Sequence, residues 1–177
     1  TLETVNLPND AFQNLSKGVQ YRTISFSEDA IPDSSAFLGF HHFLEETFPL
    51  THTKLVLEKI SDYSLLFKWE GSDTSKKPII LMSHQDVVPV DEPTLGDWEA
   101  GPFEGKITAT DILGRGTMDD KGTLIGLLEA VEKLLEESFE PSRTIYLAFG
   151  HDEEVGGVNG AAKVVEHLKA KGIQASM

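Results

Sequence analysis

Two short apolar segments constrain the fold more than any other feature of this sequence. Ile79 to Met82 and Thr144 to Phe149 are continuous runs of the length expected for strands buried on both faces of a sheet. A helical pattern of apolar residues begins at Met118, between the two runs, and another extends from Val158 to Lys171. This order of strand, helix, strand and helix predicts an α/β fold with a mostly parallel sheet and helices on both faces.

The first seventy residues predict two further helices and a hairpin. Residues 8–10 (Pro-Asn-Asp) and 32–34 (Pro-Asp-Ser) are typical helix starts. Lys54 to Ile60 and Tyr63 to Trp69 resemble strands joined by a tight turn. We expect the apolar residues of all the predicted helices to pack in the core. They include Phe12, Leu15, Val19, Phe37, Leu38, Phe40, Phe43, Leu44, Phe48, Val164, Val165 and Leu168.

Composition limits the possible functions. The chain has 177 residues, a size that fits one domain, and its formal net charge is −14. An acidic chain without a run of Lys or Arg lacks the positively charged surface that binds nucleic acids and anionic membranes. We therefore expect neither a nucleic acid nor a membrane as a partner. No apolar run approaches the ~20 residues that span a bilayer. Cysteine is absent, so a metal would have to be held by His, Asp or Glu.

The start of the sequence leaves the compartment open. The chain begins at Thr1 and shows no apolar signal-peptide segment. Either a leader has been removed or the sequence begins late. Cytoplasmic and exported locations are both compatible with this start.

Three polar clusters follow or precede the predicted buried elements. Residues 83–86 (Ser-His-Gln-Asp) follow the first run, 150–154 (Gly-His-Asp-Glu-Glu) follow the second, and Asp119-Asp120 opens the intervening helix. Ligands of open parallel sheets bind beyond the carboxyl ends of the strands, so we expect the clusters to converge. Such a gathering of carboxylates calls for a divalent cation, and His with Asp or Glu suits zinc.

Each cluster also has a simpler explanation. Asp119 and Asp120 could only favour a helix N-terminus, Glu153 and Glu154 could lie in a solvated loop, and His84 could be a locally bonded histidine. Their joint placement favours a metal site, and the His-x-Asp spacing adds weight because a ligating imidazole usually donates its other N–H to a carboxylate.

Other motifs and histidines give no comparable signal. The glycines before the long helix lack the Gly-Lys-Ser/Thr ending of a phosphate loop, and no Gly-x-Ser-x-Gly elbow occurs. We expect the remaining histidines to be solvated or structural, with His151 forming only a wall of the site. The others are His41, His42, His52 and His167.

Four ordered motifs resemble those of the M20 metallopeptidases. They are residues 80–90 (Ile-Leu-Met-Ser-His-Gln-Asp-Val-Val-Pro-Val), Trp98 with Pro102-Phe103, residues 114–122 (Gly-Arg-Gly-Thr-Met-Asp-Asp-Lys-Gly), and residues 152–157 (Asp-Glu-Glu-Val-Gly-Gly). The first motif is most similar to the carboxypeptidase S branch, and the group also includes aminoacylase-1. The resemblance extends from about Leu15 to the end of the chain.

The resemblance implies specific roles. His84 would bind one metal, Glu154 a second, and Asp119 would bridge them, while Asp86 would orient His84 and Glu153 would act as general base. The implied cofactor is Zn²⁺, two per complete site, with Co²⁺ or Mn²⁺ as alternatives. The implied reaction is hydrolysis of a peptide or N-acyl amide bond next to a free carboxylate, on a small peptide or an N-acyl amino acid.

Members of this family are much longer than 177 residues. They carry a further acidic ligand, a lid or dimerisation domain and a late histidine ligand. The chain is therefore expected to be the amino-terminal portion of a zinc-peptidase-like catalytic domain, truncated and inactive alone, from a parent that could form a homodimer. Two other readings stay open: a non-catalytic metal-binding or interaction module, and a flavodoxin-like receiver suggested by the acidic pair.

Overall fold

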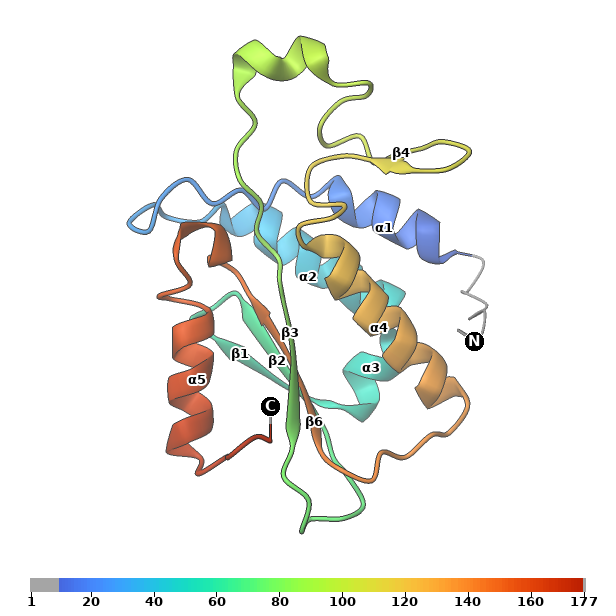
Figure 1. The fold of residues 1–177 in the computed structure, drawn as a ribbon, viewed down its shortest axis with the longest axis vertical. Coiled ribbons are helices and arrows are strands. Elements are labelled where there is room, and N and C mark those ends of the chain that lie inside the picture. The colour runs from blue at the N-terminus through green and yellow to red at the C-terminus, as the bar shows by residue number, and fades with distance from the viewer. Residues whose placement is uncertain (1–9, 177) are drawn as a thin grey trace.

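The computed structural model describes residues 10–176 and has a four-stranded sheet between two layers of helices (Figure 1). The helices are α1 (Ala11–Val19), α2 (Ser34–Thr47), α3 (Pro49–Lys54), α4 (Lys121–Glu136) and α5 (Ala161–Ala170), with 3-10 turns η1 (Glu92–Asp97) and η2 (Glu153–Val155). The strands are β1 (Val56–Ile60), β2 (Ser64–Trp69), β3 (Ile79–His84), β4 (Lys106–Ile107), β5 (Ile112–Leu113) and β6 (Ile145–Gly150). Pro8 and Asn9, expected to open the first helix, lie outside the described residues.

The main sheet has the order β1-β2-β6-β3 and is mixed. Strands β3 and β6 are parallel and are connected through α4, as the sequence predicts. The β1–β2 hairpin is also as predicted, but β2 pairs antiparallel with β6. The α/β class is therefore confirmed, whereas the expectation of a mostly parallel sheet is wrong for the described residues. The reason is that the hairpin joins the sheet beside β6 and contributes antiparallel pairs.

Helices cover both faces of the sheet, as expected (Figure 1). Successive residues of β2 and β6 point to opposite faces of the sheet, because side-chain direction alternates along a strand. Phe67 and Phe149 belong to the core shared with α2 and α4, whereas Leu66 and Ala148 pack with Val164 of α5. Both central strands are thus buried on both sides, which explains their continuous apolar sequence.

Local sequence explains the start of α2. The carboxylate of Asp33 accepts hydrogen bonds from the backbone N–H groups of Ser35 and Ala36, at 3.0 and 3.2 Å. This N-cap satisfies donors that have no partner within the helix. The predicted helix start at residues 32–34 is therefore confirmed.

The short helix α3 was not expected from the sequence. Pro49 occupies its first position, and Glu132 of α4 accepts hydrogen bonds from the N–H groups of Leu50 and Thr51, both at 2.8 Å. The cap comes from a residue 82 positions away from Leu50, so no local pattern predicts it.

Three side chains expected in the core are instead 42–53% exposed, namely Phe12, Leu38 and Val165, because they lie at the margins of the apolar helix faces.

The irregular segment after β3 leaves the main sheet. It contains η1 and a small two-stranded sheet formed by β4 and β5, which lies near α1 (Figure 1). The segment then returns to the sheet edge at the start of α4. Within residues 10–176, no helix combines the length and the apolar character needed to cross a membrane.

Candidate metal centre

The register of the parallel pair brings two of the polar clusters together. Ser83 is paired with Phe149 and His84 with Gly150, so β3 and β6 end at the same level. The next residues of both strands therefore leave the sheet side by side. The N-terminus of α4 reaches the same edge, because the Ser83 hydroxyl donates to the Asp120 carboxylate at 2.8 Å.

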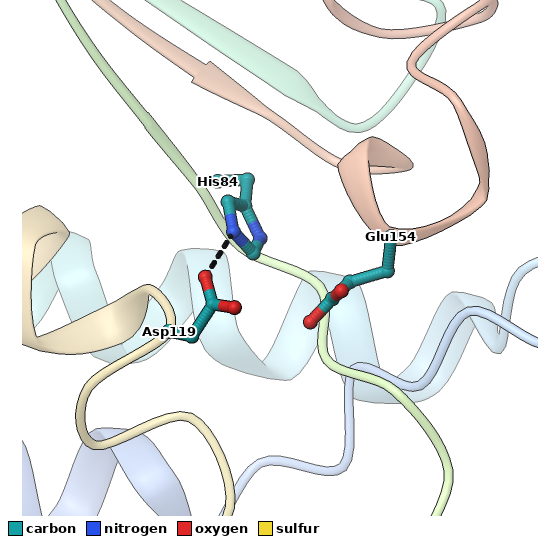
Figure 2. Close-up of side chains that lie close together, drawn as sticks. All are labelled: His84, Asp119 and Glu154. Atoms are coloured by element: carbon teal, nitrogen blue, oxygen red, sulfur yellow. Dashed lines mark hydrogen bonds and ion pairs between the residues drawn. The ribbon is translucent and has the colours of Figure 1, made fainter.

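His84 is at the centre of the cluster. Its side chain is 8% exposed, and its two ring nitrogens face different partners. Nδ1 lies 3.2 Å from Oδ1 of Asp86 and 3.0 Å from the backbone carbonyl oxygen of the same residue. Nε2 lies 3.0 Å from Oδ1 of Asp119 (Figure 2). Nε2 is therefore the nitrogen directed at the other candidate ligands.

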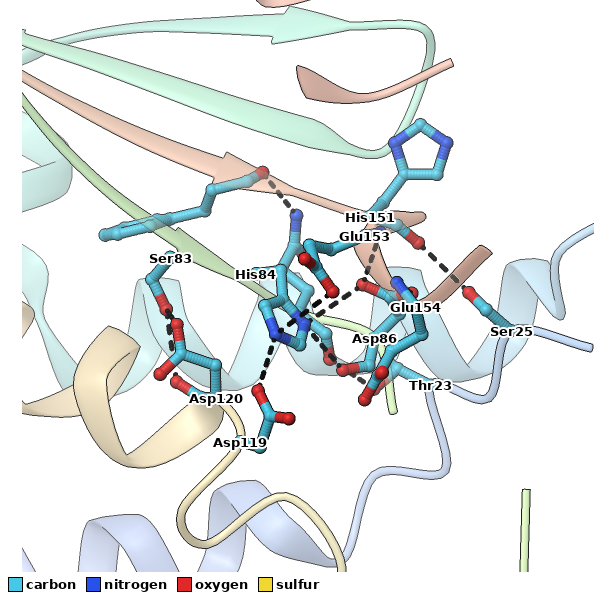
Figure 3. Close-up of polar contacts among 12 residues, drawn as sticks. Thr23, Ser25, Ser83, His84, Asp86, Asp119, Asp120, His151, Glu153 and Glu154 are labelled. Atoms are coloured by element: carbon cyan, nitrogen blue, oxygen red, sulfur yellow. Dashed lines mark hydrogen bonds and ion pairs between the residues drawn. The ribbon is translucent and has the colours of Figure 1, made fainter. Parts of the chain in front are cut away.

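The two aspartates before α4, Asp119 and Asp120, contact different partners. Asp119 extends toward His84 and is 77% exposed, whereas Asp120 turns back to Ser83 (Figure 3). The peptide bond between these two residues is cis. Because the Asp120 carboxylate is bonded to Ser83, Asp119 is the member of this pair that can act as a ligand beside His84.

Asp86 lies beneath the cluster and is fully buried. Besides facing His84, its Oδ1 accepts a hydrogen bond from the backbone N–H of Glu153, and its Oδ2 accepts one from Glu154, both at 3.1 Å. One carboxylate therefore orients the imidazole and also fixes the backbone of the loop after β6 (Figure 3).

His84, Asp119 and Glu154 offer ligand atoms that all lie within 4.8 Å of one another. Glu153 approaches the same point, with Oε2 3.8 Å from Nε2 of His84. The structure thus places all five predicted site residues around one location. Asp119 and Glu154 also line a cavity of about 330 Å³, so small molecules can reach the cluster.

The electrostatics of the cluster suit a cation. Burial and the neighbouring Asp119 charge raise the pKa of Glu154. Burial would lower the pKa of His84, but hydrogen bonds to Asp86 and Asp119 outweigh it and raise the pKa to about 9. Burial would raise the pKa of Asp86, but the contact with His84 and other hydrogen bonds hold it below its usual value. Positive charge at this point is thus strongly favoured.

Lys121 lies near the site, and the sequence patterns do not predict its role. Its side chain is fully buried, and its Nζ donates to the carbonyl oxygens of Gly18 and Tyr21 at 3.1 and 2.6 Å. Burial lowers its pKa to about 7. These contacts fasten the first turn of α4 to the last turn of α1 and to the segment that follows it. The only signal in the sequence was a lysine next to the acidic pair, which ordinarily indicates a solvated charge.

The remaining histidines face other parts of the protein. His151 is buried and packs edge-on against the rings of Phe37 and Tyr63, and its Nδ1 lies 2.7 Å from the hydroxyl of Ser64. Its ring points away from the ligand cluster (Figure 3). Outside the cluster, His41 contacts Gln85, His42 contacts Glu46, His52 contacts the carbonyl of Phe48, and His167 contacts Glu58.

Comparison with known proteins relates this geometry to one group of enzymes. Residues 80–177, more than half of the chain, match the family described as Peptidase family M20/M25/M40. The chain is 49% identical over 158 residues to "Probable carboxypeptidase S-like 2" of Dictyostelium discoideum, covering 88% of this chain and 30% of that protein. It is 39% identical over 163 residues to an N-fatty-acyl-amino acid synthase/hydrolase of Danio rerio, covering 91% and 31%.

A solved structure shares the fold. The M20 family metallo-carboxypeptidase Sso-CP2 from Sulfolobus solfataricus superposes with a TM-score of 0.70 at 25% identity, covering 95% of this chain and 36% of that chain. The chain thus spans about a third of the length of the proteins that it matches.

Proposed function

Because this chain belongs to peptidase family M20/M25/M40, we propose that it forms the amino-terminal portion of the catalytic domain of a co-catalytic dizinc hydrolase. The reaction is cleavage of a peptide or N-acyl amide bond next to a free carboxylate. The observation that carries this proposal is the convergence of His84, Asp119 and Glu154 from three separate segments at one edge of the sheet.

The donor set fits the proposed metal. One imidazole and two carboxylates are ligands that zinc accepts without cysteine. Nδ1 of His84 faces Asp86, which leaves Nε2 as the ligating atom, and this is the usual orientation of a metal-bound histidine. His84 would hold one ion, Glu154 the other, and Asp119 both. When bound, the ions lower the pKa of water and polarise the substrate carbonyl.

Glu153 is proposed as the general base. Its carboxylate is 60% exposed and faces the ligand cluster from the loop after β6. The Asp86 carboxylate accepts a hydrogen bond from the backbone N–H of Glu153, and this contact holds the base beside the ligands. Among residues 10–176, no lysine or arginine forms an ion pair with the Glu153 carboxylate, whose ionic contact is with His84. Glu153 would accept a proton from the attacking water and later deliver it to the leaving amine.

The substrate class follows from the names of two relatives. One is called carboxypeptidase S-like and the other an N-fatty-acyl-amino acid synthase/hydrolase. A carboxypeptidase and an N-acyl amino acid hydrolase both cleave an amide whose amine side carries a free carboxylate. We therefore propose this shared chemical group as the substrate class, with zinc as the cofactor.

A hydrolysis assay on the complete protein tests the proposal. Zinc-loaded protein should hydrolyse an N-acyl amino acid or a blocked dipeptide, and it should hydrolyse the corresponding C-terminal amide much more slowly. Removal of zinc with a chelator should abolish turnover, and added zinc should restore it. Equal turnover of acid and amide, or turnover unaffected by chelation, would contradict the proposal.

A further inference from the structure

Gln85 lies between His84 and Asp86, and its side chain is fully buried. Its amide nitrogen Nε2 donates to the carbonyl oxygens of Tyr63 and Phe149, at 2.8 and 2.9 Å. Its amide oxygen Oε1 lies 2.8 Å from Nε2 of His41 on α2. Every polar atom of this side chain is therefore paired inside the protein.

These contacts define the state of His41. Because both amide protons of Gln85 point at carbonyl oxygens, Oε1 must be the atom that faces His41. Nε2 of His41 therefore donates the hydrogen bond. Burial lowers the pKa of His41, so the ring is neutral, and its Nδ1 has no hydrogen-bond partner among the described residues.

The backbone of Gln85 is also held on both sides. Its N–H donates to the carbonyl oxygen of Gly150 at 2.8 Å, and its carbonyl oxygen accepts from the Thr23 hydroxyl at 2.6 Å. Phe149 and Gly150 are the last residues of β6, directly before the loop that carries Glu153 and Glu154. Gln85 thus fastens the His84–Asp86 turn to the end of the strand that leads to the other half of the site.

We propose that Gln85, held by His41, is a positioning residue that keeps the turn of His84 and Asp86 in register with the loop of Glu153 and Glu154. Only the predicted effect of Gln85 on catalysis rests on the proposed function. Its structural consequence does not need metal: Asp86 accepts hydrogen bonds from the N–H groups of Glu153 and Glu154 only if the two loops stay in register.

The first experiment uses amide hydrogen exchange of the metal-free chain. Gln85→Met preserves the length of the side chain but removes all of its hydrogen bonds. We expect the amides of Glu153 and Glu154 to exchange about tenfold faster or more, because the Asp86 contact opens more often. Thr51→Val is the matched control. It removes a buried hydroxyl that donates to Glu132, on the α3 side of α4, and it should leave both amides unchanged even if the Tm falls.

His41→Phe tests the role of the histidine. It removes the donor to Oε1 but leaves the Gln85 contacts with Tyr63 and Phe149. We expect a smaller acceleration at the same two amides, and a double variant that is no faster than Gln85→Met. Acceleration in Gln85→Met no greater than in the Thr51→Val control would overturn the proposal, as would additive effects of the two substitutions.

The second experiment measures kinetics of the complete zinc-loaded protein. Gln85→Met should lower kcat about 10–100-fold with KM changed much less, as expected when the groups supporting a metal ligand are lost. Thr51→Val should retain kcat at a temperature well below its Tm. A kcat near that of the unsubstituted protein would overturn the catalytic role. If the unsubstituted protein itself lacks activity, the proposed function fails, whereas the exchange experiment still decides the positioning role.

Discussion

Nδ1 of His84 lies 3.2 Å from the carboxylate of Asp86. This fully buried carboxylate also accepts hydrogen bonds from the backbone N–H groups of Glu153 and Glu154. The same group therefore orients the candidate ligand from β3 and the loop that carries the candidate base and second ligand. A change at Asp86 should consequently affect metal binding and loop geometry together.

Replacement of Asp86 by Asn tests this relationship. The amide is similar in shape, but it loses the charge that supports the imidazole and places an NH₂ group against one backbone N–H. We expect zinc affinity of the complete protein to fall about 10–100-fold. Competition with a chromophoric chelator measures the affinity. Asp111→Asn, which changes an exposed carboxylate outside the site, is the control, and equal affinities of the two variants would contradict the assigned role.

Replacement of Glu153 by Gln tests the base. The substitution keeps the shape of the side chain and removes its ability to accept a proton. We expect kcat of the complete protein to fall by about 10²–10⁴-fold while zinc content is retained. Glu154→Gln provides the contrast, because it should lower zinc content as well. A kcat close to normal for Glu153→Gln would show that the base is another group.

Glu132 provides a prediction about the fold alone. Its carboxylate accepts the N–H groups of Leu50 and Thr51 and the Thr51 hydroxyl, at 2.7–2.8 Å. Gln would direct an NH₂ group at donors, so Glu132→Gln should lower the free energy of unfolding by about 1–3 kcal/mol. Urea denaturation measures this change. Glu136→Gln, whose side chain is 56% exposed, should have little effect; if both variants lose equal stability, the cap contributes nothing specific.

Glu58 provides a prediction about pH. It accepts hydrogen bonds from Lys171 at 2.6–2.7 Å and contacts His167 at 3.0 Å, thereby joining β1 to α5. The Lys171 contact holds the pKa of Glu58 below its ordinary 4.5. A lowered folded-state pKa adds stability above pH 4.5 that disappears as the pH falls through the folded-state value.

Glu58→Gln should therefore lower the free energy of unfolding at pH 7, and its difference from the unsubstituted chain should shrink below pH 4.5. Denaturation curves across this range measure the difference. Glu46→Gln, which changes an exposed partner of His42, should show no comparable pH dependence. A constant difference for Glu58→Gln at every pH would refute the electrostatic explanation.

Much of the fold follows from local sequence patterns. The apolar runs of β3 and β6, the helix between them and the Asp33 cap are all encoded within a few neighbouring residues. The convergence of His84 with Glu154 could be expected for the same reason, since parallel neighbours end at one edge of the sheet.

The other features depend on partners distant in sequence. The hairpin could be recognised, but its antiparallel place beside β6 depends on a strand about eighty positions later. Lys121 can be buried because its Nζ donates hydrogen bonds to the carbonyl oxygens of Gly18 and Tyr21, which lie about a hundred positions earlier in the sequence. Gln85 resembles an ordinary polar residue until Tyr63 and Phe149 are placed around it. No local periodicity contains this information.

Anomalous X-ray diffraction at the zinc edge, from crystals of the zinc-loaded complete protein, would show directly whether His84, Asp119 and Glu154 bind zinc. We predict two peaks about 3.5–4 Å apart. One should lie at Nε2 of His84 and the other at the Glu154 carboxylate, with the Asp119 carboxylate between them. Peaks elsewhere in the protein, or no peak at these three side chains in protein that hydrolyses its substrate, would contradict this prediction.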